Sequence, residues 1–205
     1  MLPKQLKKRF QLIFVDQRAF AKTKNNLQAQ QFSLTHIVQD LEVFRKKLKI
    51  QTWSIFGHSG NGYVALSYAR AFPKRVIHLL LSALSPDLSS STFEQAESFW
   101  EQDASDERKR YFQNQITLLE QDLNDYPEEK LAYVCHRTSA KRWFDFKFNE
   151  LSLWNDVSCS DVAFDALWGD AFTKPTWFTD GFVFPMRTWL TLGRYDCVLP
   201  SHSIT

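Results

Sequence analysis

The sequence predicts the α/β class, with a mainly parallel sheet and a long helical insertion. Three observations support this prediction. Strand and helix patterns alternate over residues 10–81, which is typical of right-handed βαβ units. A glycine-rich turn at Gly57–Gly62 joins a short apolar run to a helical stretch. Residues 86–184 show no strand alternation, and a strand pattern returns only at Arg187–Leu192.

The first part of the chain supplies the alternating elements. Short apolar runs bounded by polar or turn residues predict buried strands, and apolar residues at helical spacing predict amphipathic helices. Ser33 is expected to cap the first long helix, and Pro73 to end the second. The expected elements are, in order, strand Phe10–Val15, helix Ser33–Leu48, strand Trp53–Phe56, helix Asn61–Phe72 and strand Val76–Leu81.

The insertion is predicted to be helical and to lie over the sheet. Ser91 and Glu94 have the spacing of a capping box, so a helix is expected from there to about Gln102. Further helices are expected at Ser105–Leu123 and Pro127–Arg137, followed by an irregular aromatic stretch at Trp143–Ala171. The predicted organisation is an incomplete core at residues 1–85 and 185–205 and a helical cap at residues 86–184.

Composition excludes several classes of function. The chain has 205 residues and a formal net charge of +2, too small to argue for nucleic acid or an anionic membrane as partner. Its basic clusters at Lys4–Arg9 and Arg45–Lys49 are expected to be solvated. The apolar run after the first cluster is too short for a signal peptide or a membrane span. Three scattered cysteines give no disulfide framework and no metal spacing, so we expect a cytoplasmic protein without metal or other cofactor.

Ser59 is the candidate catalytic residue. It stands at the apex of the strand–turn–helix stretch, which would place its hydroxyl at a helix N-terminus, where backbone N–H groups can hold a developing oxyanion. The alternative is a glycine-rich turn with an incidental serine. Asp196 follows the strand pattern Arg187–Leu192, so it is expected at the same sheet edge as Ser59.

These residues resemble the α/β-hydrolases, and more narrowly their proline iminopeptidase-like branch. The resemblance spans nearly the whole chain, and its motifs are specific in combination rather than singly. The stretches that match are Phe14-Val15-Asp16-Gln17-Arg18, Asp40-Leu41-Glu42, Gly57-His58-Ser59 with Gly62, Ala65-Leu66-Ser67-Tyr68-Ala69, Phe72-Pro73-Lys74-Arg75-Val76, Lys141-Arg142-Trp143-Phe144-Asp145, and Gly193-Arg194-Tyr195-Asp196 with Pro200.

The resemblance implies a role for each site residue. Ser59 would be the nucleophile, the backbone N–H of Gly60 an oxyanion donor, and Asp196 the acid that orients a catalytic histidine. The implied activity is cleavage of an ester or amide bond, such as an N-terminal proline peptide, through an acyl-enzyme. The implied partner is a small-molecule or peptide substrate, and oligomeric state stays open.

The chain also departs from the family pattern. Asn61 stands where the second glycine of Gly-x-Ser-x-Gly belongs, which predicts a wider turn. The family's oxyanion loop lies upstream of the strand that matches Phe10–Val15, and this chain has no room for it. In the family, a catalytic histidine serves as the base, and no histidine of this chain stands at the corresponding position in the sequence. The five histidines are His36, His58, His78, His136 and His202.

These absences predict a chain truncated at both ends. Without the missing strand, Phe10–Val15 would have to pair directly with Trp53–Phe56 or leave backbone groups unpaired. Two further readings therefore stand beside a serine hydrolase. One is a non-catalytic relative that binds a ligand or a partner, and the other is a degenerate fragment without a function of its own.

Overall fold

The computed structural model describes residues 4–20, 27–85, 89–155, 157, 159–173 and 181–198. It contains a parallel sheet of three strands in the order β1-β2-β3. The strands are β1 (Trp53–His58), β2 (Val76–Ser82) and β3 (Arg187–Thr191). Because all three run in the same direction, their carboxyl ends meet at one edge, where His58, Ser82 and Thr191 are in register. The predicted α/β class is confirmed, as are these three of the predicted strands.

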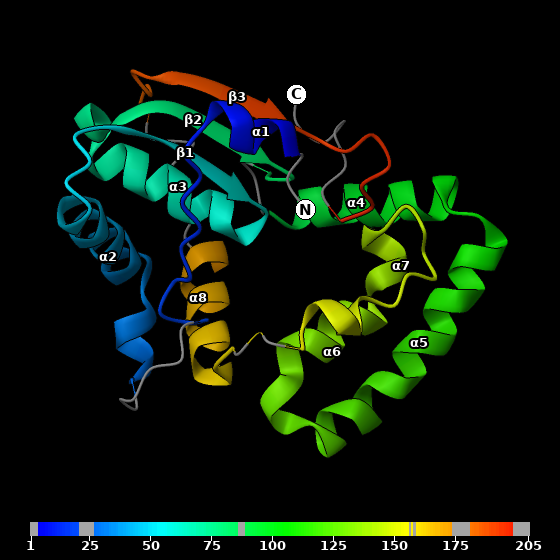
Figure 1. Ribbon diagram of the computed structural model, residues 1–205. Helices are drawn as coiled ribbons and strands as arrows, with labels where there is room; N and C mark the ends of the chain where they lie inside the picture. The colour runs from blue at the N-terminus through cyan, green and yellow to red at the C-terminus, as the bar shows by residue number, and fades with distance from the viewer. Residues whose placement is uncertain are drawn as a thin grey trace.

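Helix α3 (Gly60–Ala71) packs on one face of the sheet, and α2 (Leu34–Lys47) packs on α3 (Figure 1). Both helices were predicted from their apolar spacing. Ser33 caps α2 as expected, because its Oγ accepts a hydrogen bond from the His36 N–H at 3.4 Å. The two helices and the sheet enclose the main core, formed by Val38, Tyr63, Ala65, Leu66, Tyr68, Ala69, Val76, Leu79, Leu81 and Leu84.

A buried ion pair within α2 is hydrogen-bonded to α3. The guanidinium of Arg45 donates to both carboxylate oxygens of Glu42, at 2.7 and 2.8 Å, and Tyr68 Oη donates to the same carboxylate at 2.8 Å. The hydrogen bond from Arg45 lowers the pKa of Glu42 to about 2, whereas burial and the adjacent carboxylate raise the pKa of Tyr68. Because every charged atom has a partner, this pair can lie inside the core.

Most of the described residues between β2 and β3 form helices, and we call the first four of these α-helices, α4 to α7 with the bounds given below, the helical segment. Figure 1 shows it in green to yellow, to one side of the sheet. The helix predicted from Ser105 onwards is confirmed as α5, and Ser105 caps it by accepting from the Arg108 N–H at 3.3 Å. The elements are α4 (Ser90–Asp103), α5 (Asp106–Asp125), η3 (Pro127–Glu129), α6 (Lys130–Arg137) and α7 (Ser139–Arg142), followed by η4 (Glu150–Leu153).

Two local predictions in the insertion are wrong. Ser91 does not cap α4, which already begins at Ser90, and Ser91 Oγ instead accepts from the Gln95 amide one turn later. The end of the aromatic stretch predicted to be irregular forms α8 (Asp161–Thr173). Ala163 and Leu167 of α8 pack with Phe32, Ile37 and Val64, so tertiary burial stabilises a helix whose local pattern is weak.

The predicted strand Phe10–Val15 is also wrong. The short helix α1 (Lys4–Arg9) precedes it, and residues 11–17 are neither helix nor strand. Phe10 and Phe14 are 60% and 70% exposed, so the apolar run lacks both a ladder partner and a covering layer. An extended segment without a paired neighbour does not become a strand, however apolar it is.

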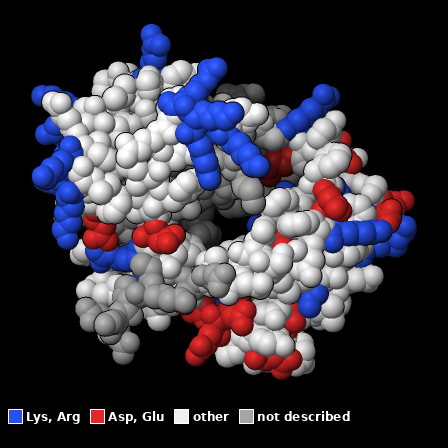
Figure 2. All heavy atoms as spheres, in the orientation of Figure 1, with Lys and Arg blue, Asp and Glu red and all other residues white. Residues whose placement is uncertain are grey.

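The basic cluster of α1 is solvated, as expected. Lys7, Lys8 and Arg9 are exposed. Figure 2 shows a group of basic side chains at the place of α1, in front of the sheet. Two short 3₁₀ turns complete the fold, η1 (Ala29–Phe32) and η2 (Pro73–Arg75). Within the described residues, no helix is both long and apolar enough to cross a bilayer.

Candidate active site

Ser59 occupies the turn between β1 and α3 in a strained backbone conformation. Its φ is 51° and its ψ is −131°, a combination that a residue with a Cβ rarely adopts. The turn is held on both sides, because the Ser59 N–H donates to the Ser82 carbonyl at 2.9 Å and the Ser59 carbonyl accepts from the Gly62 N–H at 2.8 Å. Such strain, worth about 1–3 kcal/mol, persists only where the surroundings enforce it and is concentrated at functional sites. Ser59 itself is exposed.

Gly57 allows the strand and the helix to approach closely at this turn. A Cβ at position 57 would lie 2.6 Å from the Asn61 carbonyl oxygen, 2.7 Å from Gly62 Cα and 2.9 Å from Ala65 Cβ. Two of these three atoms belong to the backbone, so they cannot move aside cheaply. A glycine at position 57 is therefore a requirement of the turn that raises Ser59.

Asn61 is accommodated because its side chain points to solvent. Its Oδ1 accepts a hydrogen bond from Gln17 Nε2 at 2.9 Å, which ties the segment after the exposed apolar run to the first turn of α3. The sequence had singled out both residues, Gln17 in the matched motif and Asn61 as a departure. Nothing in their separation of 44 positions in the sequence indicated that they pair.

Asp196 lies just beyond the carboxyl end of β3. The Thr191 carbonyl accepts from the Ala83 N–H at 2.9 Å, so the end of β3 is fixed beside the end of β2, which in turn holds Ser59. Asp196 Oδ1 accepts from the Val198 N–H at 2.9 Å, and the Asp196 N–H donates to the Gly193 carbonyl at 3.3 Å. The structure thus puts Ser59 and Asp196 at the same sheet edge.

The described histidines have other surroundings. His36 hydrogen-bonds to Ser33 at 2.8 Å and His78 to Ser54 at 3.0 Å. His136 is buried in α6, and burial lowers the pKa of its imidazole. His58 is exposed on β1, and within the described part of the chain no hydrogen bond joins a histidine to Ser59. His202 lies outside the described residues.

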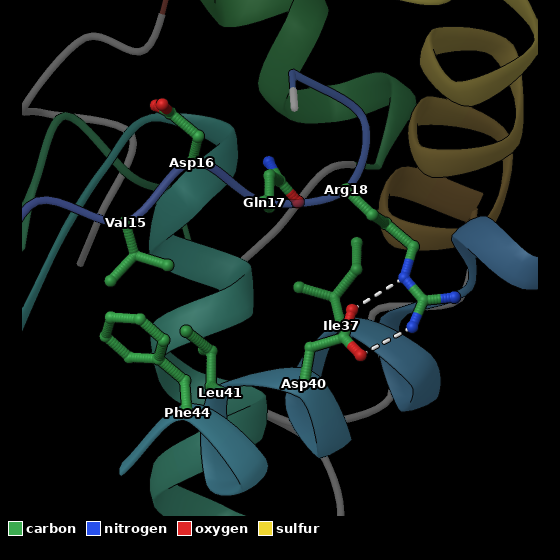
Figure 3. A pocket seen from close by; sticks show the side chains of 8 residues that line it. All are labelled: Val15, Asp16, Gln17, Arg18, Ile37, Asp40, Leu41 and Phe44. Atoms are coloured by element: carbon green, nitrogen blue, oxygen red, sulfur yellow. Dashed lines mark hydrogen bonds and ion pairs between the residues drawn. The ribbon is translucent and has the colours of Figure 1, made fainter. Parts of the chain in front are cut away.

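A small cavity of about 120 Å³ lies apart from the serine turn, between α2 and the segment that leads to Gln17. Arg18 lines it and donates to both carboxylate oxygens of Asp40, at 2.5 and 2.6 Å (Figure 3). Arg18 also donates to the Gln31 carbonyl. Arg18 and Asp40 neutralise one another, so neither of these two side chains offers a free charge to an incoming ligand. Its lining residues are Val15, Asp16, Gln17, Arg18, Ile37, Asp40, Leu41 and Phe44.

No group of three or more His, Cys, Asp and Glu side chains among the described residues is arranged to hold a metal ion. The predicted site residues that follow the strand ends supply a hydroxyl at Ser59, a backbone N–H at Gly60 and a carboxylate at Asp196. These are the groups that acyl transfer uses as nucleophile, oxyanion donor and acid.

The family model described as the alpha/beta hydrolase fold matches residues 1–163. The chain belongs to the α/β-hydrolase family. The resemblance predicted from the sequence is thereby confirmed, and the sharp turn between a parallel strand and a helix at Ser59 is a feature that α/β-hydrolases share.

Individual relatives agree with the family assignment. The AB hydrolase superfamily protein YclE of Bacillus subtilis is 34% identical over 199 residues, which cover 97% of this chain and 71% of that protein. The proline iminopeptidase of Neisseria meningitidis serogroup A is 31% identical over 75 residues, 37% of this chain and 24% of that enzyme. Among solved structures, an epoxide hydrolase of Bacillus megaterium superposes with a TM-score of 0.54 at 12% identity, covering 91% of this chain and 68% of that chain.

Proposed function

We propose that this α/β-hydrolase is a serine hydrolase that cleaves an ester or amide bond. The main observation for this proposal is the backbone of Ser59, which is strained, exposed and fixed by hydrogen bonds at the N-terminus of α3. A structural serine would have no need of a positive φ. A nucleophile needs it, because the turn projects the hydroxyl away from both the strand and the helix.

In the proposed reaction, Ser59 Oγ attacks the substrate carbonyl while a histidine base accepts its proton. The oxyanion that forms is held by the N–H of Gly60, which is free of an intrahelical partner because it belongs to the first turn of α3. The protonated base then delivers the proton to the leaving alcohol or amine. Water hydrolyses the resulting acyl-enzyme by the same steps in reverse. Asp196 orients the base and stabilises its positive charge.

The substrate class is proposed from the relatives. The match to the Neisseria enzyme favours a peptide with an N-terminal proline, and residues 86–184 would form a cap over the site. The histidine base is not identified among the described residues, so the proposal assigns the nucleophile, one oxyanion donor and the acid.

A fluorophosphonate probe tests this proposal directly, because it labels only an activated serine. Labelling is expected in the wild type, lost in Ser59→Ala and kept in Ser54→Ala, whose hydroxyl is exposed on the same strand but at its other end. A folded wild type with a cooperative melt and no labelling would overturn the proposal.

A second candidate function is ligand binding without catalysis. The observation that favours it is the engagement of His36 and His78 with Ser33 and Ser54, which commits two of the histidines to other elements. In that case a bound ligand would raise the melting temperature equally in the wild type and Ser59→Ala, with no turnover. Stabilisation by substrate analogues that depends on Ser59 would contradict it.

A further inference from the structure

The loop Gly193–Val198, which carries Asp196, has one buried residue, Cys197. This side chain is 6% exposed, whereas Gly193, Arg194, Tyr195 and Val198 are exposed and Asp196 is half-buried. Cys197 does not pack on the sheet that the loop leaves. It packs in a cluster with Trp100 of α4 and Ala140 of α7, so the loop is anchored in the helical segment. In Figure 1 the red chain after β3 accordingly runs to α4.

The wall that receives Cys197 is built from contacts within the helical segment. The rings of Trp100 and Phe112 meet edge to face at 5.4 Å, and Lys141 Nζ lies about 5 Å from both ring centroids while it bonds to Glu97. Arg108 donates to the Ala140 carbonyl at 3.1 Å, which fixes the other side of the wall. The wall is therefore preformed, and the loop is the part that adapts to it.

The position of Cys197 is transmitted to Asp196 by local hydrogen bonds. The two residues are adjacent, and the Asp196 carboxylate accepts from the Val198 N–H on the far side of Cys197. The Asp196 N–H donates back to Gly193, and Cys197 Sγ lies 3.7 Å from the Tyr195 carbonyl. These bonds make the loop a compact unit, so a displacement of Cys197 displaces the Asp196 carboxylate with it.

We propose that Cys197 is a positioning residue, and that its packing against Trp100 and Ala140 sets the place of the Asp196 carboxylate at the sheet edge. The helical segment thereby regulates the acid of the site, because a movement of that segment withdraws or restores the carboxylate. The catalytic meaning of this coupling rests on the proposed function, whereas the mechanical coupling itself does not.

The first test compares two aromatic residues of the same helix. Trp100→Ala removes the wall behind Cys197, and Phe93→Ala, on α4 but 52% exposed, is the matched control. Trp100→Ala is expected to speed both maleimide labelling of Cys197 and amide exchange at Val198 by about tenfold or more, because local opening becomes easier. Phe93→Ala is expected to change neither rate. Faster labelling with unchanged exchange at Val198 would overturn the proposal, because the carboxylate would then hold its place without the anchor.

A milder variant covers the case in which Trp100→Ala does not fold. Cys197→Ala removes only the sulfur, and Cys135→Ala is its control on a half-buried thiol of α6. Faster exchange at Val198 in Cys197→Ala alone supports the anchor. Equal exchange in the two variants overturns it.

The pH profile of Ser59 labelling separates positioning from general destabilisation. If Cys197→Ala displaces the Asp196 carboxylate, a negative charge that favours the protonated histidine base moves away from it, and the pKa of that base falls. The acid limb of the labelling profile should therefore move to lower pH in Cys197→Ala. A merely structural role would lower the plateau and leave the limb in place, which counts against the proposal. If the wild type is not labelled at all, the proposed function fails, and exchange at Val198 still decides whether the anchor exists.

Discussion

Gly57→Ala tests the reasoning about the serine turn through a single added methyl group. Its Cβ would meet three atoms closer than 3.0 Å, of which the Asn61 carbonyl oxygen and Gly62 Cα belong to the backbone of α3. Relieving such contacts means moving the helix off the strand, at a cost of about 3 kcal/mol. Alanine also lowers the conformational entropy of the unfolded chain relative to glycine, which raises the free energy of unfolding by about 1 kcal/mol. We therefore expect a net loss of about 2 kcal/mol in the free energy of unfolding, measured by urea denaturation.

Gly62→Ala is the matched control on the other side of Ser59. Its Cβ would meet only the side chain of Leu84, at 3.2 Å, and that side chain can shift. Alanine is also favoured over glycine inside a helix by about 1 kcal/mol, so the net change should stay within about 1 kcal/mol. Equal stability losses in the two variants would refute the argument, because they would show that the strand and the helix do not approach at Gly57.

Three further predictions concern the surroundings of the site. Glu42→Gln should cost about 3 kcal/mol at neutral pH, because it leaves the Arg45 charge buried without its partner. Since the folded pKa of Glu42 is about 2 against an ordinary value of 4.5, the stabilisation is present above pH 4.5 and fades as pH falls from 4.5 towards 2. The gap between wild type and Glu42→Gln in denaturation should narrow over that range, and a constant gap would contradict the charge argument. A double-mutant cycle of Arg18→Met and Asp40→Asn should give a coupling free energy of about 1 kcal/mol. This coupling should shrink with added salt, because Asp40 is partly exposed. A coupling free energy of zero would show that the pair is not formed in solution. Phe14→Ser should change stability by less than about 0.5 kcal/mol, because the ring is 70% exposed, and a much larger loss would mean that the ring is buried.

The sequence predicted the fold of the turn around Ser59 better than the fold of its surroundings. The order strand, turn, helix around Ser59 depends on residues within one short stretch, and local preferences are enough to specify it. Asp196 could be placed at the same edge because a parallel sheet aligns the carboxyl ends of its strands. Ser59, Gly60 and Asp196 remain predictions as catalytic groups until Ser59 is probed.

The errors share a physical cause. Phe10–Val15 has the composition of a buried strand, but a strand also needs a neighbour that accepts its backbone hydrogen bonds, and composition cannot report that neighbour. Helix α8 is the opposite case, because the structure contains it although the sequence did not predict it. Its local pattern is weak, and its burial against α2, α3 and η1 stabilises it.

The sequence by itself determined the local structure at the turn: a serine between Gly57 and Gly60, at the start of a helix and after an apolar strand. Only the tertiary structure decided that Gln17 reaches Asn61 and that Cys197 ties the Asp196 loop to the helical segment. The physical reason is the sequence separation over which each kind of interaction acts. Turn and helix preferences act over a few residues, whereas these contacts join residues far apart in the chain whose proximity depends on the packing of every element between them.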